Sequence, residues 1–320
     1  MFILVATISF LCAAWLFVNL VHAVWVETRR HLWERRITRQ PNGLLPEADA
    51  YQVGNGPIAL LFIHGFADTP CLWRRITRRL AANGAFTCRA MRLPGSAEPA
   101  ARSKLQSLEI WRAHVDDELA RLHEAHKTVW VIGHSLGGTL ALDAALRHPV
   151  LVDGVAALAP VFEISRQCLP LFPPPVWFSI ARIALCLSPT LESPFSDDNV
   201  AADDPLFVHK RDRFIPFRAY CAVVDLTRAI RNQSTRPACP LFAVESEQDP
   251  IVDGPAALRW MDACTGPKEV IKLTNAGHLI PLEKGWQEGT DAFAAFVLSH
   301  TPAVSASAID AAGQPHPRRS

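Results

Sequence analysis

The sequence predicts an α/β fold in which a mostly parallel β-sheet is covered by helices on both faces. Short apolar runs of strand length alternate with amphipathic stretches of helix length over most of the chain. At one passage from strand to helix, a serine stands between two glycines. The length of 320 residues suits one large α/β domain that carries an insertion.

Six strands follow from the apolar runs, each bounded by turn residues or by the start of a helical pattern. The expected strands are 58–63, 86–91, 129–132, 154–158, 241–245 and 269–273. The expected helices are 73–82, 108–126, the segment from the serine to His148, 255–264 and 286–298. The α/β core is therefore expected in two parts, 50–160 and 241–300.

The segment 161–240 breaks this alternation and contains no predicted strand. It falls between two strands of the sheet, so it is expected to be a helical cap over one end of the domain. Its run "LPLFPPPVWFSIARIALCL" is compatible with an acyl pocket, with contact to lipid, or with ordinary packing between cap helices. The tail 301–320 is rich in small and polar residues and is expected to be disordered.

The N-terminal segment 1–27 is predicted to be a membrane anchor. Residues 2–26 contain no Asp, Glu, Lys or Arg, and a helix of this length crosses the roughly 30 Å hydrocarbon layer. Trp25 stands where an interfacial ring is expected. A cleaved secretory signal is the alternative, with "VHA" as its cleavage site, but no basic residue precedes the apolar run and the run is long for a signal.

The segment 28–49 is predicted to be a basic, polar linker. Five arginines stand in its first part and are opposed by few acidic residues. By the positive-inside rule, the body of a single-pass protein would then face the cytoplasm.

Overall charge and cysteine content exclude other classes of function. The net charge is +1, from 32 basic and 31 acidic residues, so no nucleic-acid partner is expected. The eight cysteines show no C-x-x-C or metal-ligand spacing. Apart from Cys12 in the apolar segment, they are expected to be small buried hydrophobes, and we expect no metal or cofactor.

Ser135 is the candidate nucleophile. It is the serine of a G-x-S-x-G pattern, "GHSLG", with a predicted strand before it and a helix after it. The pattern alone arises by chance in about one chain in ten of this length, so the strand and helix on either side carry the argument. In this turn the hydroxyl is forced outwards, and the helix N-terminus behind it favours negative charge.

A histidine and an acid are required to activate this serine. His278 is the candidate base, because it follows the last predicted strand at the edge where Ser135 must also lie. Asp249 follows the strand 241–245 and completes the chain order Ser, Asp, His. Asp253 and Glu247 are alternatives for the acid, and Asp253 is also a candidate N-cap of the next helix.

Two backbone N–H groups are expected to stabilise the oxyanion formed in acyl transfer. One belongs to Leu136, directly after the serine, and the other to Phe66 in the loop "HGFADTP" after the first strand. In the same regions His64 is expected to hold its loop, and His134 to be a packing residue that points away from the site.

Four motifs, "LLFIHGFADTP", "GHSLGG", "SEQDPIVD" and "AGHLIPLE", together resemble the α/β-hydrolase superfamily. Within it, the chain is similar to the carboxylesterase and monoacylglycerol-lipase-like branch over residues 50–299. The resemblance implies the α/β-hydrolase fold and ester hydrolysis through an acyl-enzyme on Ser135, Asp249 and His278. One departure is Ser96 in "RLPGSAEPA", where relatives commonly have histidine.

The hypothesis from the sequence is a membrane-anchored serine hydrolase of carboxylic esters, with acyl-lipid or medium- to long-chain esters as substrates. An acyltransferase or thioesterase would use the same three residues and differ only in the acceptor. A non-catalytic interaction protein on this fold is a third possibility, and it predicts a broken site. The sequence assigns neither the acyl chain length nor the oligomeric state.

Overall fold

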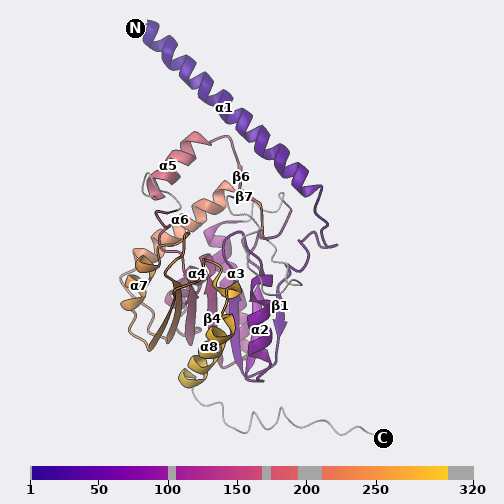
Figure 1. Cartoon of the computed structure of the whole chain (residues 1–320), viewed down its shortest axis with the longest axis vertical. Helices are drawn as coiled ribbons and strands as arrows, with labels where there is room; N and C mark the ends of the chain where they lie inside the picture. Colours follow the sequence, from indigo (N-terminus) through magenta and orange to yellow (C-terminus); the bar gives the residue numbers. More distant parts are fainter. Residues whose placement is uncertain (1, 100–105, 168–173, 194–210, 302–320) are drawn as a thin grey trace.

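A seven-stranded, mostly parallel sheet forms the centre of the protein (Figure 1). The computed structural model describes residues 2–99, 106–167, 174–193 and 211–301. The strand order is β1-β3-β2-β4-β5-β8-β9, and only β1 runs antiparallel to its neighbour β3. The strands are β1 Tyr51–Val53, β2 Ile58–Ile63, β3 Phe86–Met91, β4 Thr128–His134, β5 Gly154–Leu158, β8 Leu241–Ser246 and β9 Lys268–Leu273.

The predicted α/β class is correct, and all six predicted strands are present. Strand β1 was not predicted from the sequence, because it has only three residues and forms by pairing with β3. The central strands β2 and β4 are buried along their whole length. Strands covered on both faces lack a polar side, which explains their continuous apolar runs.

Helices flank both faces of the sheet: in Figure 1, α2 Arg74–Ala81 and α8 Trp286–His300 lie in front of it, and α3 Leu108–Ala125 and α4 Leu136–Arg147 behind it. The indole of Trp130 on β4 packs edge-on against Phe293 and Phe296 of α8, with ring centroids 6.3 and 5.9 Å apart. This aromatic cluster fixes α8 against the middle of the sheet.

The core also contains α7 Gly254–Asp262 and the short 3₁₀ turns Pro70–Trp73 and Ile280–Leu282. The helix expected at 73–82 is thus a 3₁₀ turn followed by α2. Asp253 is the N-cap of α7, and its Oδ1 accepts a hydrogen bond from the Ala256 N–H at 2.9 Å. The predicted capping role of Asp253 is therefore confirmed.

The cap between β5 and β8 contains α5 Pro174–Ala184 and α6 Phe217–Arg231. The prediction that it holds no strand is wrong, because β6 Thr190–Glu192 and β7 Phe214–Pro216 pair antiparallel. Each has three residues and is far from the other in sequence, so neither forms a recognisable apolar run. Of the segments discussed above, residues 168–173 and 194–210 of the cap, with Cys168 and the start of the apolar run, and the tail 302–320 lie outside the described residues.

The N-terminal helix α1, Phe2–Glu34, projects from the body towards the cap end of the molecule (Figure 1). In the described part of the chain it is the single helix long and apolar enough to cross a membrane. It continues beyond residue 27, so residues 28–34, expected in a linker, are helical. The expectation of buried cysteines holds for Cys71, Cys88 and Cys264, whereas Cys186 is exposed.

Candidate active site

Ser135 lies at a strained turn between β4 and α4. Its φ of 54° and ψ of −119° place it in a region that non-glycine residues rarely adopt. The flanking glycines are required by space: a Cβ on Gly133 would lie 2.0 Å from the Gly137 carbonyl oxygen, and one on Gly137 would lie 2.1 Å from that of Ile63. Strand and helix therefore approach so closely that the serine is forced to the apex.

Three side chains from separate loops form a hydrogen-bonded series at the carboxyl ends of the strands. His278 Nε2 lies 3.0 Å from the Ser135 hydroxyl oxygen, and His278 Nδ1 lies 2.7 Å from Oδ2 of Asp249. Ser135 and Asp249 are both buried, with 7% and 6% of their surface exposed. The structure thus brings together the three residues predicted as nucleophile, base and acid.

Asp249 is held on both of its oxygens. Its Oδ1 accepts from the N–H groups of Ile251 and Val252 at 2.8 and 3.1 Å, while Oδ2 faces His278. Burial opposes ionisation of this carboxyl, but the hydrogen bond and charge of His278 and the two N–H groups outweigh it and lower the pKa of Asp249. Asp249 is therefore an anion at neutral pH.

The two alternative acids lie outside this series. Asp253 uses its carboxylate to cap α7. Glu247 is exposed at the end of β8, where its N–H donates to the Leu273 carbonyl. Asp249 is the one of these three acids that contacts His278.

The loop that carries Phe66 passes directly against Ser135. A Cβ on Gly65 would lie 3.4 Å from Cβ of Ser135, so this loop and the serine turn are in close contact. The ring of Phe66 packs edge-on against Tyr220 of α6, with centroids 4.9 Å apart. The cap thus covers the loop that holds the predicted oxyanion donor.

His64 holds this loop, as predicted from the sequence. Its Nε2 accepts from the Leu93 N–H at 3.0 Å, which leaves Nδ1 to donate to the Gly65 carbonyl at 2.9 Å. The contact to Leu93 joins the first loop to the segment that contains Ser96. Ser96 itself is buried.

His134 has a role at the site that the sequence analysis missed. Instead of pointing away, its Nε2 lies 2.7 Å from the backbone carbonyl oxygen of His278, and the two rings are 4.9 Å apart. Burial and the neighbouring His278 lower the pKa of His134 to about 3, so it is neutral. Its position beside the serine in "GHSLG" was the one signal in the sequence that could have indicated this contact.

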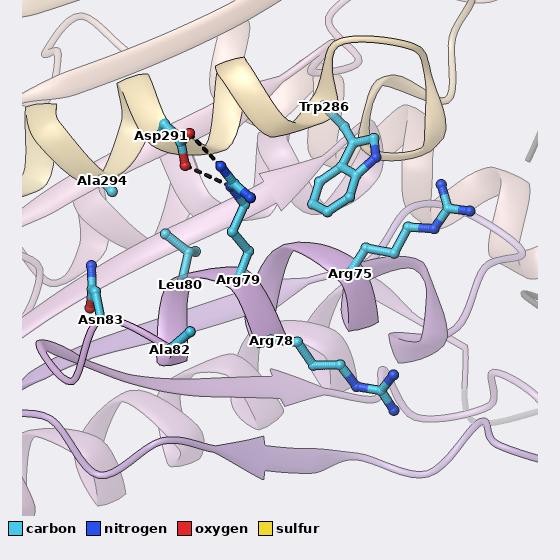
Figure 2. Close-up of a pocket in the computed structure, with 9 residues that line it drawn as sticks. All are labelled: Arg75, Arg78, Arg79, Leu80, Ala82, Asn83, Trp286, Asp291 and Ala294. Atoms are coloured by element: carbon cyan, nitrogen blue, oxygen red, sulfur yellow. Dashed lines mark hydrogen bonds and ion pairs between the residues drawn. The ribbon is translucent and has the colours of Figure 1, made fainter. Parts of the chain in front are cut away.

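A groove of about 670 Å³ lies elsewhere, between α2 and α8 (Figure 2). Figure 2 shows Arg79 and Asp291 paired across it, at 2.6 Å, with Trp286 at one end. None of Ser135, Asp249 and His278 lines this groove. Its size therefore does not mark it as the place of the chemistry.

Fold and site together define a hydrolase of the α/β type, and the comparison with known families agrees. The sequence matches the alpha/beta hydrolase family over residues 60–296. The chain belongs to this family. The match begins at β2, so α1 lies outside the shared domain.

Several relatives are lipases. The chain is 25% identical over 243 residues to a thermostable monoacylglycerol lipase of Bacillus sp. (strain H-257), which covers 75% of this chain and 90% of the relative. The fold of the present chain is similar to that of the solved structure of the metagenome-derived lipolytic enzymes LipS and LipT. The TM-score is 0.69 and the identity 20%, and the match covers 80% of this chain and 100% of the solved chain. It is also similar to a monoacylglycerol lipase of Paleococcus ferrophilus, with a TM-score of 0.65, 20% identity and coverage of 79% and 98%.

Proposed function

We propose that this protein is a membrane-anchored serine hydrolase that cleaves carboxylic esters of acyl lipids or of other medium- to long-chain acyl groups. The observation that carries the proposal is the hydrogen-bonded series Ser135–His278–Asp249 at a strained, glycine-flanked turn. Membership of a family with lipase relatives supports an ester as the substrate.

In the proposed reaction, Ser135 Oγ attacks the ester carbonyl carbon while Nε2 of His278 takes the hydroxyl proton. The C–O bond to the alcohol then breaks, and His278 returns the proton to the departing oxygen. Water attacks the acyl-enzyme by the same route and releases the carboxylic acid. Asp249, as an anion on Nδ1, orients the imidazole and stabilises its charged form.

The developing oxyanion would accept hydrogen bonds from the N–H groups of Leu136 and Phe66. Leu136 is the first residue of α4, where N–H groups have no acceptor within the helix and the dipole favours negative charge. Phe66 follows Gly65, which lies against the Ser135 side chain. Among the described residues, no backbone carbonyl accepts from either N–H.

An acyl-lipid substrate is favoured by the anchor and by the relatives. Helix α1 would hold the domain at a membrane, where substrates with long acyl chains reside. The arginines that follow the apolar part of α1 favour a cytoplasmic domain. The similar lipase from Bacillus sp. is named for monoacylglycerol, which combines a free glycerol head group with one acyl chain.

The proposal is tested with p-nitrophenyl esters from acetyl to palmitoyl and with a monoacylglycerol, using the full-length protein in detergent. We expect hydrolysis that is strongest for acyl groups of eight carbons or more, at about the length where lipid substrates begin. Absence of hydrolysis across the whole series, in folded protein, would overturn the esterase function. Product analysis with added alcohol or thiol separates the alternatives, since an acyltransferase would form the new ester or thioester in preference to free acid.

A further inference from the structure

The two parts of α1 have different surroundings. Every described side chain from Phe2 to Val18 is exposed, whereas Asn19 and Val26 are buried against the body of the protein. At 1.5 Å per residue, the free part is about 26 Å long, close to the thickness of a bilayer core. If α1 crosses a membrane with this free part, the contact with the body begins at the level of the lipid head groups.

The second part of α1 is attached to the cap. Three of its side chains, spaced seven and four residues apart along one face of the helix, make the contacts. They are His22 with the Ser188 hydroxyl at 2.8 Å, Arg29 with both oxygens of Glu192 at 2.6 and 2.7 Å, and the ring of Trp33 with that of Phe214 at 5.7 Å. The residues on the cap side belong to β6, to β7 and to the turn that leads from α5 into β6.

Helix α5 of the cap exposes an apolar stripe. Val176, Ile180 and Ile183 follow each other at intervals of four and three residues, which places them on one side of the helix, and the apolar Leu187 follows in the turn after α5. Each exposes between 39% and 66% of its surface. Leu187 is the direct neighbour of Ser188, which contacts α1, so the stripe begins where the anchor meets the cap.

Resting on the membrane anchoring proposed above, we propose that this stripe on α5 is a second membrane contact, whose partner is the lipid bilayer. The apolar surface of α5 continues the apolar surface of α1 at the head-group level, and α5 lies at the end of the body towards α1 (Figure 1). The ion pair of Arg29 with Glu192 holds the cap to the anchor. The anchor thus places the cap over the active site in contact with the lipid phase, from which an acyl substrate enters.

The contact requires the cap to keep its position along α1. Glu192 of β6 is also paired with Arg213, at 2.9 Å, so the carboxylate joins the anchor to β6 and to the residue directly before β7. The opposite charges and the two parallel hydrogen bonds fix how the guanidinium of Arg29 and the carboxylate of Glu192 face each other. Loss of the Glu192 carboxylate would remove one of the three contacts that hold the cap to α1, without changing an apolar side chain of the stripe.

The stripe is tested with the double variant Ile180→Glu/Ile183→Glu in full-length protein reconstituted into phosphatidylcholine vesicles that carry a monoacylglycerol. We expect hydrolysis of the vesicle-borne substrate to fall by about tenfold, because carboxylates resist burial in the interface, while hydrolysis of p-nitrophenyl acetate is unchanged. Equal activity of variant and wild type on vesicles would overturn the proposal, as would an equal loss on both substrates.

A matched control is Val150→Glu. Val150 is 84% exposed and lies after α4, at the amino end of β5 and therefore at the opposite end of the sheet from Ser135. A carboxylate at this exposed apolar position should change neither reaction. A vesicle-specific loss in Val150→Glu as well would show that added negative charge, and not its place on α5, causes the effect, and would contradict the proposal.

A second readout does not depend on catalysis. Ile183→Cys is introduced into a protein whose exposed cysteines are replaced, Cys12→Ser/Cys186→Ser, and is labelled with a polarity-sensitive fluorophore. The same protein without Ile183→Cys is labelled in parallel, and its signal, which comes from the remaining thiols, is subtracted. We expect the emission of the label at position 183 to be shifted to the blue with vesicles relative to detergent-free buffer. A control label at Val150→Cys should show no such shift. Protein that floats with the vesicles but shows no shift at 183 overturns the α5 contact alone, whereas failure to float overturns the anchor itself.

The link between anchor and cap is tested by Glu192→Gln, with Asp291→Asn as the control. Asp291 of α8 also forms a two-pronged ion pair with an exposed arginine, Arg79 of α2 (Figure 2), and neither residue belongs to the cap. We expect Glu192→Gln to lower vesicle hydrolysis several-fold and Asp291→Asn to leave it unchanged. Full vesicle activity and an unaltered emission shift in Glu192→Gln would overturn the role of this ion pair.

Discussion

His134 Nε2 donates a hydrogen bond to the backbone carbonyl oxygen of His278, 2.7 Å away. A carbonyl oxygen only accepts, so the proton of the neutral His134 ring must be on Nε2. The contact ties the residue before the proposed nucleophile, Ser135, to the residue proposed as its base. His278 is therefore held on its backbone by His134 and on its ring by Asp249.

We predict that His134→Phe lowers kcat by about tenfold, because loss of one buried hydrogen bond costs about 1–3 kcal/mol and releases the backbone of His278. His134→Gln, which keeps an N–H donor, should retain more activity than His134→Phe. Because the pKa of His134 is about 3, the loss should be the same at every pH from 6 to 9. Full activity of His134→Phe, or a loss confined to one part of that range, would contradict this positioning role.

Asp249→Asn should lower kcat by about 10⁴-fold, since an amide leaves the imidazole in the wrong tautomer. Glu247→Gln should keep the activity of the wild type. Asp253→Ala should keep its activity too, but lose about 1 kcal/mol of stability with the cap of α7. Steady-state kinetics and thermal unfolding of the three variants separate these roles, and a large loss of kcat in Glu247→Gln or Asp253→Ala would contradict the assignment of the acid.

The titration of Glu245 is expected to make the free energy of unfolding depend on pH. It is buried on β8, and neither of its oxygens has a hydrogen-bond partner among the described residues. Burial, together with the charge of Asp249, raises its pKa to about 8. The folded state therefore keeps a proton that the unfolded chain releases near pH 4.5, so this group lowers stability progressively as pH rises from 4.5 to 8.

Glu245→Gln removes this dependence. We expect the Tm of this variant to exceed that of the wild type by at least about 2 °C at pH 8 and to match it near pH 4.5. A shift of about 2 °C corresponds to about 1 kcal/mol of stability in a domain of this size. Thermal unfolding of both proteins at several pH values measures the difference. An identical pH dependence in the two proteins would show that Glu245 does not titrate in this range.

Much of the fold and site was predictable because the determining signals are local. The buried strands are continuous apolar runs, and the nucleophile turn is spelled in five residues. Once Ser135 was placed at the carboxyl edge of a parallel sheet, Asp249 and His278 followed from their positions after later strands. The structure brings these three side chains into hydrogen-bond contact.

The features that were missed depend on distant partners. The three residues of β6 form a strand only because β7 pairs with them. The contact of His134 is with the backbone carbonyl of His278, 144 residues further along the chain, so no local pattern around His134 reveals it. The extension of α1 to Glu34 is supported by contacts with the cap, such as that of Arg29 with Glu192, which no local pattern reveals.

The central claim, that Ser135 is the nucleophile, is tested most directly by covalent labelling. The full-length protein is treated with a fluorophosphonate probe and the modified peptide is identified by mass spectrometry, in parallel with Ser135→Ala. We predict one phosphonylated residue, Ser135, in the wild type and no labelling of the variant. Labelling that persists in Ser135→Ala, or that falls on another residue of the wild type, would contradict the account.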